Sequence, residues 1–344
     1  MEAVPAPQDK RIDLVLEGGG VKGIGLVGAL AVLDERGFVP QNIAGTSAGA
    51  IAAVLTAAGY TPAELRSILR SLDFRKFKDK GWEDRIPLIG APLSLFKDRG
   101  VYEGEFFLGW IGELLAAKDV FTYADLVHPE FSSEPRFRYR GQVIASDLTD
   151  RRLLVLPQDS IRFGLEPDEL NVAEAVRMSM SIPAFFEPWS WKSETDGRTH
   201  TIVDGGMLSN FPVWLYDDGD DPSWPTFGLM LVEPEPSRDL GHRLPPDGES
   251  GSLPEFAKSI VHTMLEAHDR MYLESASFVR TISVKTLGVR TTEFDLPRER
   301  ADALYESGRT GAESFLADWD FEAYKAGFRR SEAPSRRASM RAVD

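Results

Sequence analysis

A serine with the surroundings of a catalytic nucleophile occurs at position 47, in the pentapeptide Gly45-Thr46-Ser47-Ala48-Gly49. The pattern G-x-S-x-G is typical of a nucleophile elbow, in which a sharp turn between a strand and a helix holds the serine Oγ above a sheet. The small flanking residues let other backbone segments approach, and the N–H that follows the serine can join an oxyanion hole. The alternative is a glycine-rich helix start in which Ser47 is only an N-cap. The apolar strand expected at 42–46 and the apolar helix expected at 48–58 favour the elbow.

A second motif, Gly18-Gly19-Gly20-Val21-Lys22-Gly23, lies between an expected strand at 12–17 and an expected helix at 21–37. Glycines in this position allow a tight turn and present backbone N–H groups at a helix N-terminus, where anions bind. The same pattern occurs in dinucleotide-binding folds, which need an acidic residue at the end of the second strand to hold a ribose. That strand ends here with Ile43-Ala44-Gly45, so the dinucleotide interpretation is disfavoured.

A serine nucleophile needs a base, and none of the five histidines has a motif around it. His200 is the strongest candidate because it precedes Asp204 on one expected strand. Four residues of strand span about 13 Å, so His200 and Asp204 could not easily reach the same serine. The third motif, Asp204-Gly205-Gly206, is by itself compatible with a simple β-turn. His262 and His268 match no metal-binding spacing, and all five histidines are interpreted as structural or surface residues, namely His128, His200, His242, His262 and His268.

Taken in this order, GGGVKG, GTSAG and DGG resemble the patatin-like phospholipase family. The similarity continues between the motifs, because SMSIPAFFEPW at 179–189 resembles the family's Ser-x-x-x-Pro-x-x-Phe-x-Pro segment. The segments RGVYEGE (99–105), FTYADL (121–126) and VIASDLTDRRLLVLP (143–157) also resemble bacterial members. The resemblance covers roughly residues 10 to 235, whereas 253–330 resemble the family only loosely.

The resemblance implies a Ser–Asp dyad without histidine, in which Ser47 attacks a lipid ester and Asp204 takes its proton. It also implies an oxyanion hole formed by the Gly-rich loop with help from Ala48, and release of the acyl group by water. Lys22 stands where many members carry arginine, which implies a contact with an anion or lipid phosphate, although lysine lacks the bidentate fork. No metal or cofactor is implied. The motif glycines are Gly18, Gly19, Gly20, Gly23, Gly45, Gly49, Gly205 and Gly206.

The expected activity is that of a phospholipase A or lysophospholipase, in preference to a triacylglycerol lipase. A transacylase or thioesterase would use the same residues, and a non-catalytic lipid-binding or scaffold protein is the alternative from another class. A carboxylate with a pKa near its ordinary value of about 4 is a poor base for an alcohol. The chemistry therefore depends on burial, close geometry and oxyanion donors.

The alternation of expected strands and helices indicates parallel strands covered by helices. We expect an α/β fold, a three-layer α/β/α sandwich around a central, mostly parallel sheet. One catalytic domain is predicted at 11–330, with its core motifs in 12–235 and a helical and strand completion in 253–330. Further elements are expected from a strand pair in 137–157, a helix at 171–180, strands at 200–204, 227–233 and 278–285, and helices near 253–277 and 297–327. Residues 1–10 are expected to be a flexible N-terminus and 331–344 a disordered tail.

Composition excludes several classes of function. The chain has no cysteine, which excludes disulfides, thiolate catalysis and cysteine-ligated zinc. A net charge of −15 argues against general nucleic-acid binding. No apolar run is long enough to span a membrane, and the N-terminus lacks the pattern of a signal peptide. We therefore expect a cytoplasmic protein, with peripheral membrane contact as an open possibility.

That possibility rests on residues 66–99, which carry nine basic and five acidic residues in an acidic chain. Aromatic and aliphatic residues are mixed with these charges, a composition suited to settling on anionic headgroups. The alternative is a solvated connector whose aromatic residues cover the core. The next helix is expected to bury Phe106, Phe107 and Trp110.

Overall fold

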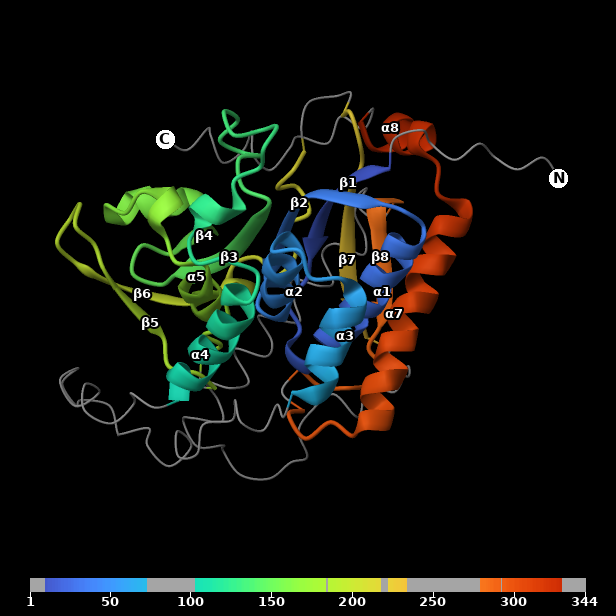
Figure 1. Ribbon diagram of the computed structural model, residues 1–344, viewed down its shortest axis with the longest axis horizontal. Coiled ribbons are helices and arrows are strands. Elements are labelled where there is room, and N and C mark those ends of the chain that lie inside the picture. Colours follow the sequence, from blue (N-terminus) through green and yellow to red (C-terminus); the bar gives the residue numbers. More distant parts are fainter. Residues whose placement is uncertain are drawn as a thin grey trace, which may run out of the picture.

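The computed structural model describes residues 10–72, 103–183, 185–217, 222–233, 279–291 and 293–329 (Figure 1). Several expectations fall outside these ranges, namely the N-terminus before Lys10, the helix near 253–277, the tail at 331–344 and most of the basic segment. Among the described residues, no helix has both the length and the apolar character that crossing a bilayer requires.

Eight strands of the described residues form one sheet, namely β1 (Arg11–Leu16), β2 (Val39–Thr46), β3 (Gly141–Asp147), β4 (Arg152–Leu156), β5 (Trp189–Lys192), β6 (Thr199–Asp204), β7 (Thr226–Val232) and β8 (Thr281–Lys285). Their order is β5-β6-β3-β2-β1-β7-β8, with β4 paired to β3 beside this path. The pairs β1–β2, β1–β7, β2–β3 and β7–β8 are parallel, whereas β4, β5 and β6 pair in antiparallel fashion. The fold is therefore mixed α/β, with a mostly parallel central sheet flanked by helices.

Alternating side chains of β1 divide the core in two, because successive strand residues face opposite sides of a sheet. Leu14 and Leu16 join the larger apolar cluster with the helices, and Val15 joins the smaller one on the other face, where Phe211 and Val213 cover the sheet. The described helices are α1 (Gly23–Glu35), α2 (Ala48–Ala57), α3 (Pro62–Ser71), α4 (Glu103–Ala116), α5 (Val172–Ser179), α7 (Arg298–Asp318) and α8 (Phe321–Arg329). Four of the described helices, α1, α2, α5 and α7, contact the strands, whereas α3 packs on α1 and α4 packs on α5. Helix α7 borders the sheet on the right of Figure 1.

The helix expected at 297–327 is in fact two helices. Trp319 adopts an extended backbone after α7, and the Asp320 carboxylate then accepts a hydrogen bond from the Ala323 N–H at 2.7 Å. A side chain that binds the N–H three residues on is an N-cap, so Asp320 starts α8 in a new direction. Strand β5, a short edge strand, was not expected from the sequence.

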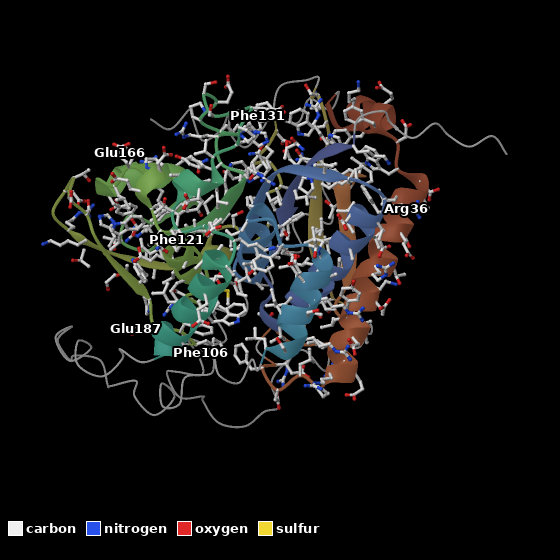
Figure 2. The ribbon with its side chains drawn as sticks, viewed as in Figure 1. Arg36, Phe106, Phe121, Phe131, Glu166 and Glu187 are labelled. Carbon is white, nitrogen blue, oxygen red and sulfur yellow. The ribbon has the colours of Figure 1, made fainter. Side chains whose placement is uncertain are left out.

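One expectation about α4 needs correction, and the start of the basic segment belongs to α3. Phe107 is buried as predicted and Trp110 packs partly against the core, but Phe106 is 40% exposed near the first turn of α4 (Figure 2). Within 66–72, the only described part of the basic segment, residues 66–71 belong to α3. Arg70 pairs with Asp302 at 3.1 Å, and Arg66 stacks on the Tyr305 ring. These two basic residues therefore bind α7.

Candidate active site

The ends of β2 and β6 meet beside β3. Thr46, the last residue of β2, pairs with Ile144, and Asp204, the last residue of β6, pairs with the next residue, Ala145. Strand β4 pairs with both Ile144 and Ala145, so β2 and β6 must share the other side of β3. Since β2 runs parallel to β3 and β6 runs antiparallel, the two strands approach each other end to end. Ser47 follows the end of one and Asp204 is the end of the other.

Ser47 has the backbone of a nucleophile elbow. Its φ of 53° and ψ of −124° lie in a region that residues with a Cβ rarely occupy. The residue is buried, and its side chain makes no capping hydrogen bond to α2, which removes the simple N-cap alternative. Its hydroxyl donates at 3.6 Å to the Met180 sulfur, a weak acceptor. The strained backbone thus carries a serine hydroxyl without a strong partner.

Asp204 is 1% exposed. Its Oδ1 accepts a hydrogen bond from the Gly206 N–H at 2.7 Å, and its Oδ2 is buried without a partner among the described residues. Burial raises the pKa of Asp204 to about 7, against the opposing effects of the nearby Ser47 hydroxyl and the Gly206 N–H. A carboxylate with such a pKa is half ionised at neutral pH and can accept a proton from a close neighbour.

The Gly-rich loop lies beside Ser47, since a Cβ at Gly18 would be 3.2 Å from the Ser47 Cβ. The Gly18 N–H donates to the Asn210 carbonyl at 3.3 Å and is already engaged. Within the described part of the chain, the N–H groups of Gly19 and Gly20 donate no hydrogen bond, nor does that of Ala48 in the first turn of α2. N–H groups beside a serine that donate no other hydrogen bond can stabilise an oxyanion. Of the residues predicted for the oxyanion hole, Gly19, Gly20 and Ala48 have such N–H groups.

The other motif glycines permit close backbone approach. A Cβ at Gly49 would lie 2.4 Å from the Leu16 carbonyl oxygen, and one at Gly205 would lie 2.4 Å from the Ile144 carbonyl oxygen. A Cβ at Gly45 would meet the Gly49 carbonyl oxygen at 2.2 Å, and one at Gly23 would meet the Ala48 Cβ at 3.0 Å. Any side chain at Gly45, Gly49 or Gly205 would push apart the segments that carry the serine and the aspartate.

Lys22 is buried and its Nζ lies 2.8 Å from Glu233 Oε1. The other Glu233 oxygen accepts a hydrogen bond from the Thr286 hydroxyl at 2.7 Å. Lys22 therefore has a carboxylate partner, and a lipid phosphate could bind it only by sharing or displacing that partner. Its predicted contact with an anion stays a prediction.

The two described histidines, His128 and His200, do not contact Ser47. The His200 Nδ1 lies 2.7 Å from Asp147 Oδ2, and its Nε2 lies 3.2 Å from Asp196 Oδ2. Within the described ranges, Asp147, Asp150 and His200 form the group whose spacing could hold a metal ion, with ligand atoms within 4.8 Å of one another. However, Arg198 pairs with Asp150 at 2.9 Å and with the neighbouring Asp196 at 2.7 Å, so Asp150 already has a cationic partner.

An apolar cavity of about 40 Å³ adjoins the elbow. Ala48 lines it beside Ser47, and Met180, whose sulfur contacts the Ser47 hydroxyl, forms another part of its wall. The side chains that form its wall are apolar, so the cavity suits an apolar group better than a polar one. The rest of the wall is Gly20, Val21, Gly23, Ile24, Val27, Ile51, Ala52, Leu55, Leu65, Ile68, Leu69, Leu72, Phe186 and Phe294.

Sequence reasoning assigned no role to several residues that hold this site together. Ser179 accepts a hydrogen bond from the Ser47 N–H at 2.8 Å. Asn210 donates to the Gly18 carbonyl at 3.1 Å and to the buried Glu17 carboxylate at 3.3 Å. Ser179 lies in a segment that resembles the family, but its contact partner is 132 residues away. Neither composition nor spacing could reveal such a contact.

Together, these groups could perform acyl transfer. A poorly bonded serine hydroxyl faces a buried carboxyl group whose pKa lies near neutrality, and free N–H donors flank the serine. Hydrolysis of an ester requires a nucleophile, a base and oxyanion donors, and groups of these chemical types lie together here.

The chain is similar to several known proteins. The family model "Patatin-like phospholipase" matches residues 14–216. The uncharacterized protein YqhO of Bacillus subtilis is 38% identical over 310 residues, covering 90% of this chain and 99% of that protein. A probable lipid hydrolase, 463L, of Invertebrate iridescent virus 6 is 23% identical over 209 residues, or 58% of this chain and 61% of the viral protein.

Among solved structures, VipD from Legionella pneumophila matches with a TM-score of 0.54 at 18% identity, covering 91% of this chain and 68% of VipD. At that identity the match supports the fold alone. The family model matches more than half of the chain and includes the Gly-rich loop, the serine elbow and the Asp-Gly-Gly motif. The chain belongs to the patatin-like phospholipase family.

Proposed function

We propose that this protein hydrolyses carboxylic esters of phospholipids or lysophospholipids, with Ser47 as nucleophile and Asp204 as proton acceptor. The observation that carries the proposal is the pairing of a strained serine, at a φ of 53°, with a buried aspartate whose unpartnered oxygen has no competing donor among the described residues. Backbone strain of this kind concentrates at functional sites because folding alone does not favour it.

In the first half of the reaction, Ser47 Oγ attacks the ester carbonyl carbon while Asp204 Oδ2 takes the hydroxyl proton. Negative charge develops on the carbonyl oxygen, where the N–H groups of Gly19, Gly20 and Ala48 stabilise it. The C–O bond to the leaving alcohol then breaks, and Asp204 returns the proton to that alcohol. The product is an acyl group covalently bound to Ser47.

In the second half, water replaces the alcohol. The water oxygen attacks the acyl carbon while Asp204 takes a proton from the water, and the same N–H groups bind the second oxyanion. The bond to Ser47 Oγ breaks, and Asp204 protonates the departing serine. The apolar cavity beside Ala48 and Met180 is suited to the acyl chain, since it offers apolar walls next to the reacting carbon.

The direct test combines covalent labelling with product analysis. A fluorophosphonate should label Ser47 in the wild-type protein and fail to label Ser47→Ala. Mass spectrometry of products from a mixed-chain phospholipid should then show which ester bond is cleaved. Absence of labelling in the folded wild-type protein would contradict the proposal and favour a non-catalytic lipid-binding or scaffold protein.

A transacylase or thioesterase would also be labelled, because the same dyad would form the same acyl-enzyme. These activities differ in the acceptor or leaving group, so they are distinguished by offering a thioester or an acceptor alcohol beside the phospholipid. Free fatty acid from the phospholipid, at a rate unaffected by the added alcohol, is the expected result.

Membrane contact through residues 66–99 is a separate proposal, based on nine basic residues against five acidic ones. Lys76, Lys78 and Lys80 lie outside the described residues and do not belong to the proposed dyad. Neutralising all three should weaken binding to anionic vesicles by up to about a hundredfold at low salt, at about 1 kcal/mol for each residue. Hydrolysis of a short soluble ester should not change. An equal loss on both substrates would contradict the membrane role.

A further inference from the structure

Ser179 connects the nucleophile to the sheet through its side chain. It is fully buried, and its hydroxyl donates to the Ile144 carbonyl at 2.6 Å. The same oxygen accepts the hydrogen bond from the Ser47 N–H at 2.8 Å. Because donating its proton to β3 fixes the orientation of the hydroxyl, a lone pair of Ser179 points at the elbow.

The hydrogen bond to Ser179 matters because the backbone of Ser47 does not hold its conformation by itself. A non-glycine residue at a φ of 53° and a ψ of −124° persists only where the surrounding structure constrains it. The Ser47 N–H belongs to the strained residue, and Ser179 is its acceptor. The acceptor comes from the end of α5, outside both the strand and the helix that form the elbow.

The residues that follow Ser179 contact the rest of the dyad. The Met180 sulfur lies 3.6 Å from Ser47 Oγ, and the Ser181 carbonyl accepts a hydrogen bond from the Asp204 N–H at 3.0 Å. Arg177 stabilises this segment, because its guanidinium donates hydrogen bonds to the Ser181 hydroxyl at 2.5 Å and to the Glu187 carbonyl at 3.0 Å. Residues 179–181 therefore contact the nucleophile and the base at the same time.

We propose that Ser179 is a positioning residue, which sets the attack geometry of Ser47 relative to Asp204 through the Ser47 N–H. This inference rests on the proposed function, because it requires Ser47 to be the nucleophile. Ser179 itself touches neither substrate nor the transferred proton.

Two variants separate hydrogen bonding from packing. Ser179→Ala removes the acceptor, and Ser179→Cys retains nearly the same shape but offers sulfur, which is a weak acceptor. On a short soluble ester, both should lower kcat about 10- to 100-fold, because a small displacement of a reacting group has effects of that size. KM should change less than about twofold, since binding contacts are retained. The rate of fluorophosphonate labelling at Ser47 should fall by the same factor as kcat.

Ser160→Ala is the matched control. Ser160 is also fully buried, and its hydroxyl donates to a backbone carbonyl, that of Leu165, at 2.9 Å. This control should also lower the melting temperature, because a buried hydrogen bond is lost, while leaving kcat and the labelling rate unchanged.

The possible outcomes distinguish the two levels of the hypothesis. If Ser47→Ala is inactive but both Ser179 variants retain wild-type kcat, the positioning role is wrong and the dyad stands. If Ser47→Ala remains active, the proposed function itself is wrong. If Ser179→Ala does not fold, Ser179→Cys decides, and a folded cysteine variant with wild-type kcat overturns the inference. A loss of kcat in Ser160→Ala equal to that in Ser179→Ala would also overturn it.

Discussion

A buried aspartate with a side-chain neighbour lies at each end of β6, and the two aspartates differ in how they are bonded. At the start of the strand, His200 lies between Asp147 and Asp196, with both ring nitrogens bonded. At its end, Asp204 keeps an oxygen without a partner in the described structure, and Ser47 lies beside it. A histidine with an aspartate partner would ordinarily suggest a catalytic pair. In this protein, however, both ring nitrogens of His200 already have carboxylate partners.

The difference lies in how the carboxylates are satisfied. Asp147 accepts hydrogen bonds from the N–H groups of Thr149 and Asp150, at 2.8 Å and 3.3 Å, in addition to its contact with His200. Such bonds compensate a buried charge and close a turn. Asp204 has one backbone donor, and burial raises its pKa. A buried carboxylate that the fold leaves incompletely bonded, next to a hydroxyl, is the better candidate for proton transfer.

The largest expected effect tests this contrast directly. Ser47→Ala and Asp204→Asn should each remove at least about three powers of ten from kcat, as loss of a nucleophile or its base usually does. Asp147→Asn and His200→Ala should retain activity within about tenfold when folded, because they act only through structure. Steady-state hydrolysis of a soluble ester measures the activity of each variant, and circular dichroism shows whether it is folded. A folded His200→Ala variant without activity would reverse the comparison.

The second prediction concerns the pH dependence of the rate. Asp204 must be ionised to accept a proton, and its pKa is raised to about 7. The wild-type kcat should therefore rise with pH and level off above neutrality, and it should be about a hundredfold lower at pH 5 than at the plateau. An acid limb near pH 4 would mean that Asp204 is solvated or is not the base.

The third prediction concerns stability. The pKa of Asp204 is about 7 in the folded protein and has its ordinary value of 3.8 in the unfolded chain. Between pH 3.8 and pH 7, Asp204 is therefore protonated in the folded protein and ionised in the unfolded chain. Stability is thus lost as pH rises from 3.8 to 7. Asp204→Asn removes this effect and should raise the unfolding free energy by about 1–4 kcal/mol at pH 8, and by much less at pH 4. Urea denaturation at both pH values would measure it.

The smallest effect is expected at His200. Burial alone would lower the pKa of His200, but its hydrogen bonds to Asp147 and Asp196 outweigh burial and raise it. The stabilisation is complete below the unfolded pKa of about 6.5 and is lost as pH rises through the higher folded pKa. His200→Gln should therefore cost more stability at pH 6 than at pH 9. EDTA should change neither rate nor stability, and a loss of both with EDTA would instead assign a metal to this end of β6.

The sequence alone was sufficient to locate the elements around the candidate nucleophile. Gly45-Thr46-Ser47-Ala48-Gly49 predicted a strand, a turn and a buried helix, and these are β2, the strained Ser47 and α2. Local patterns suffice here because glycine spacing and apolar runs restrict the backbone within a few residues. The break at Trp319 and the short strand β5 were missed, since their signals are single residues such as the Asp320 cap.

The relation between the parts was decided only in three dimensions. The pairing of Ile144 with Thr46 and of Ala145 with Asp204 places two strand ends together across more than 150 residues of sequence. That meeting buries Asp204, and burial sets its pKa. The hydrogen bond from the Ser47 N–H to Ser179 likewise joins segments far apart in the chain. Long-range contacts of this kind depend on sheet order and register, which no short pattern specifies, so the sequence named the residues and the tertiary structure set their geometry.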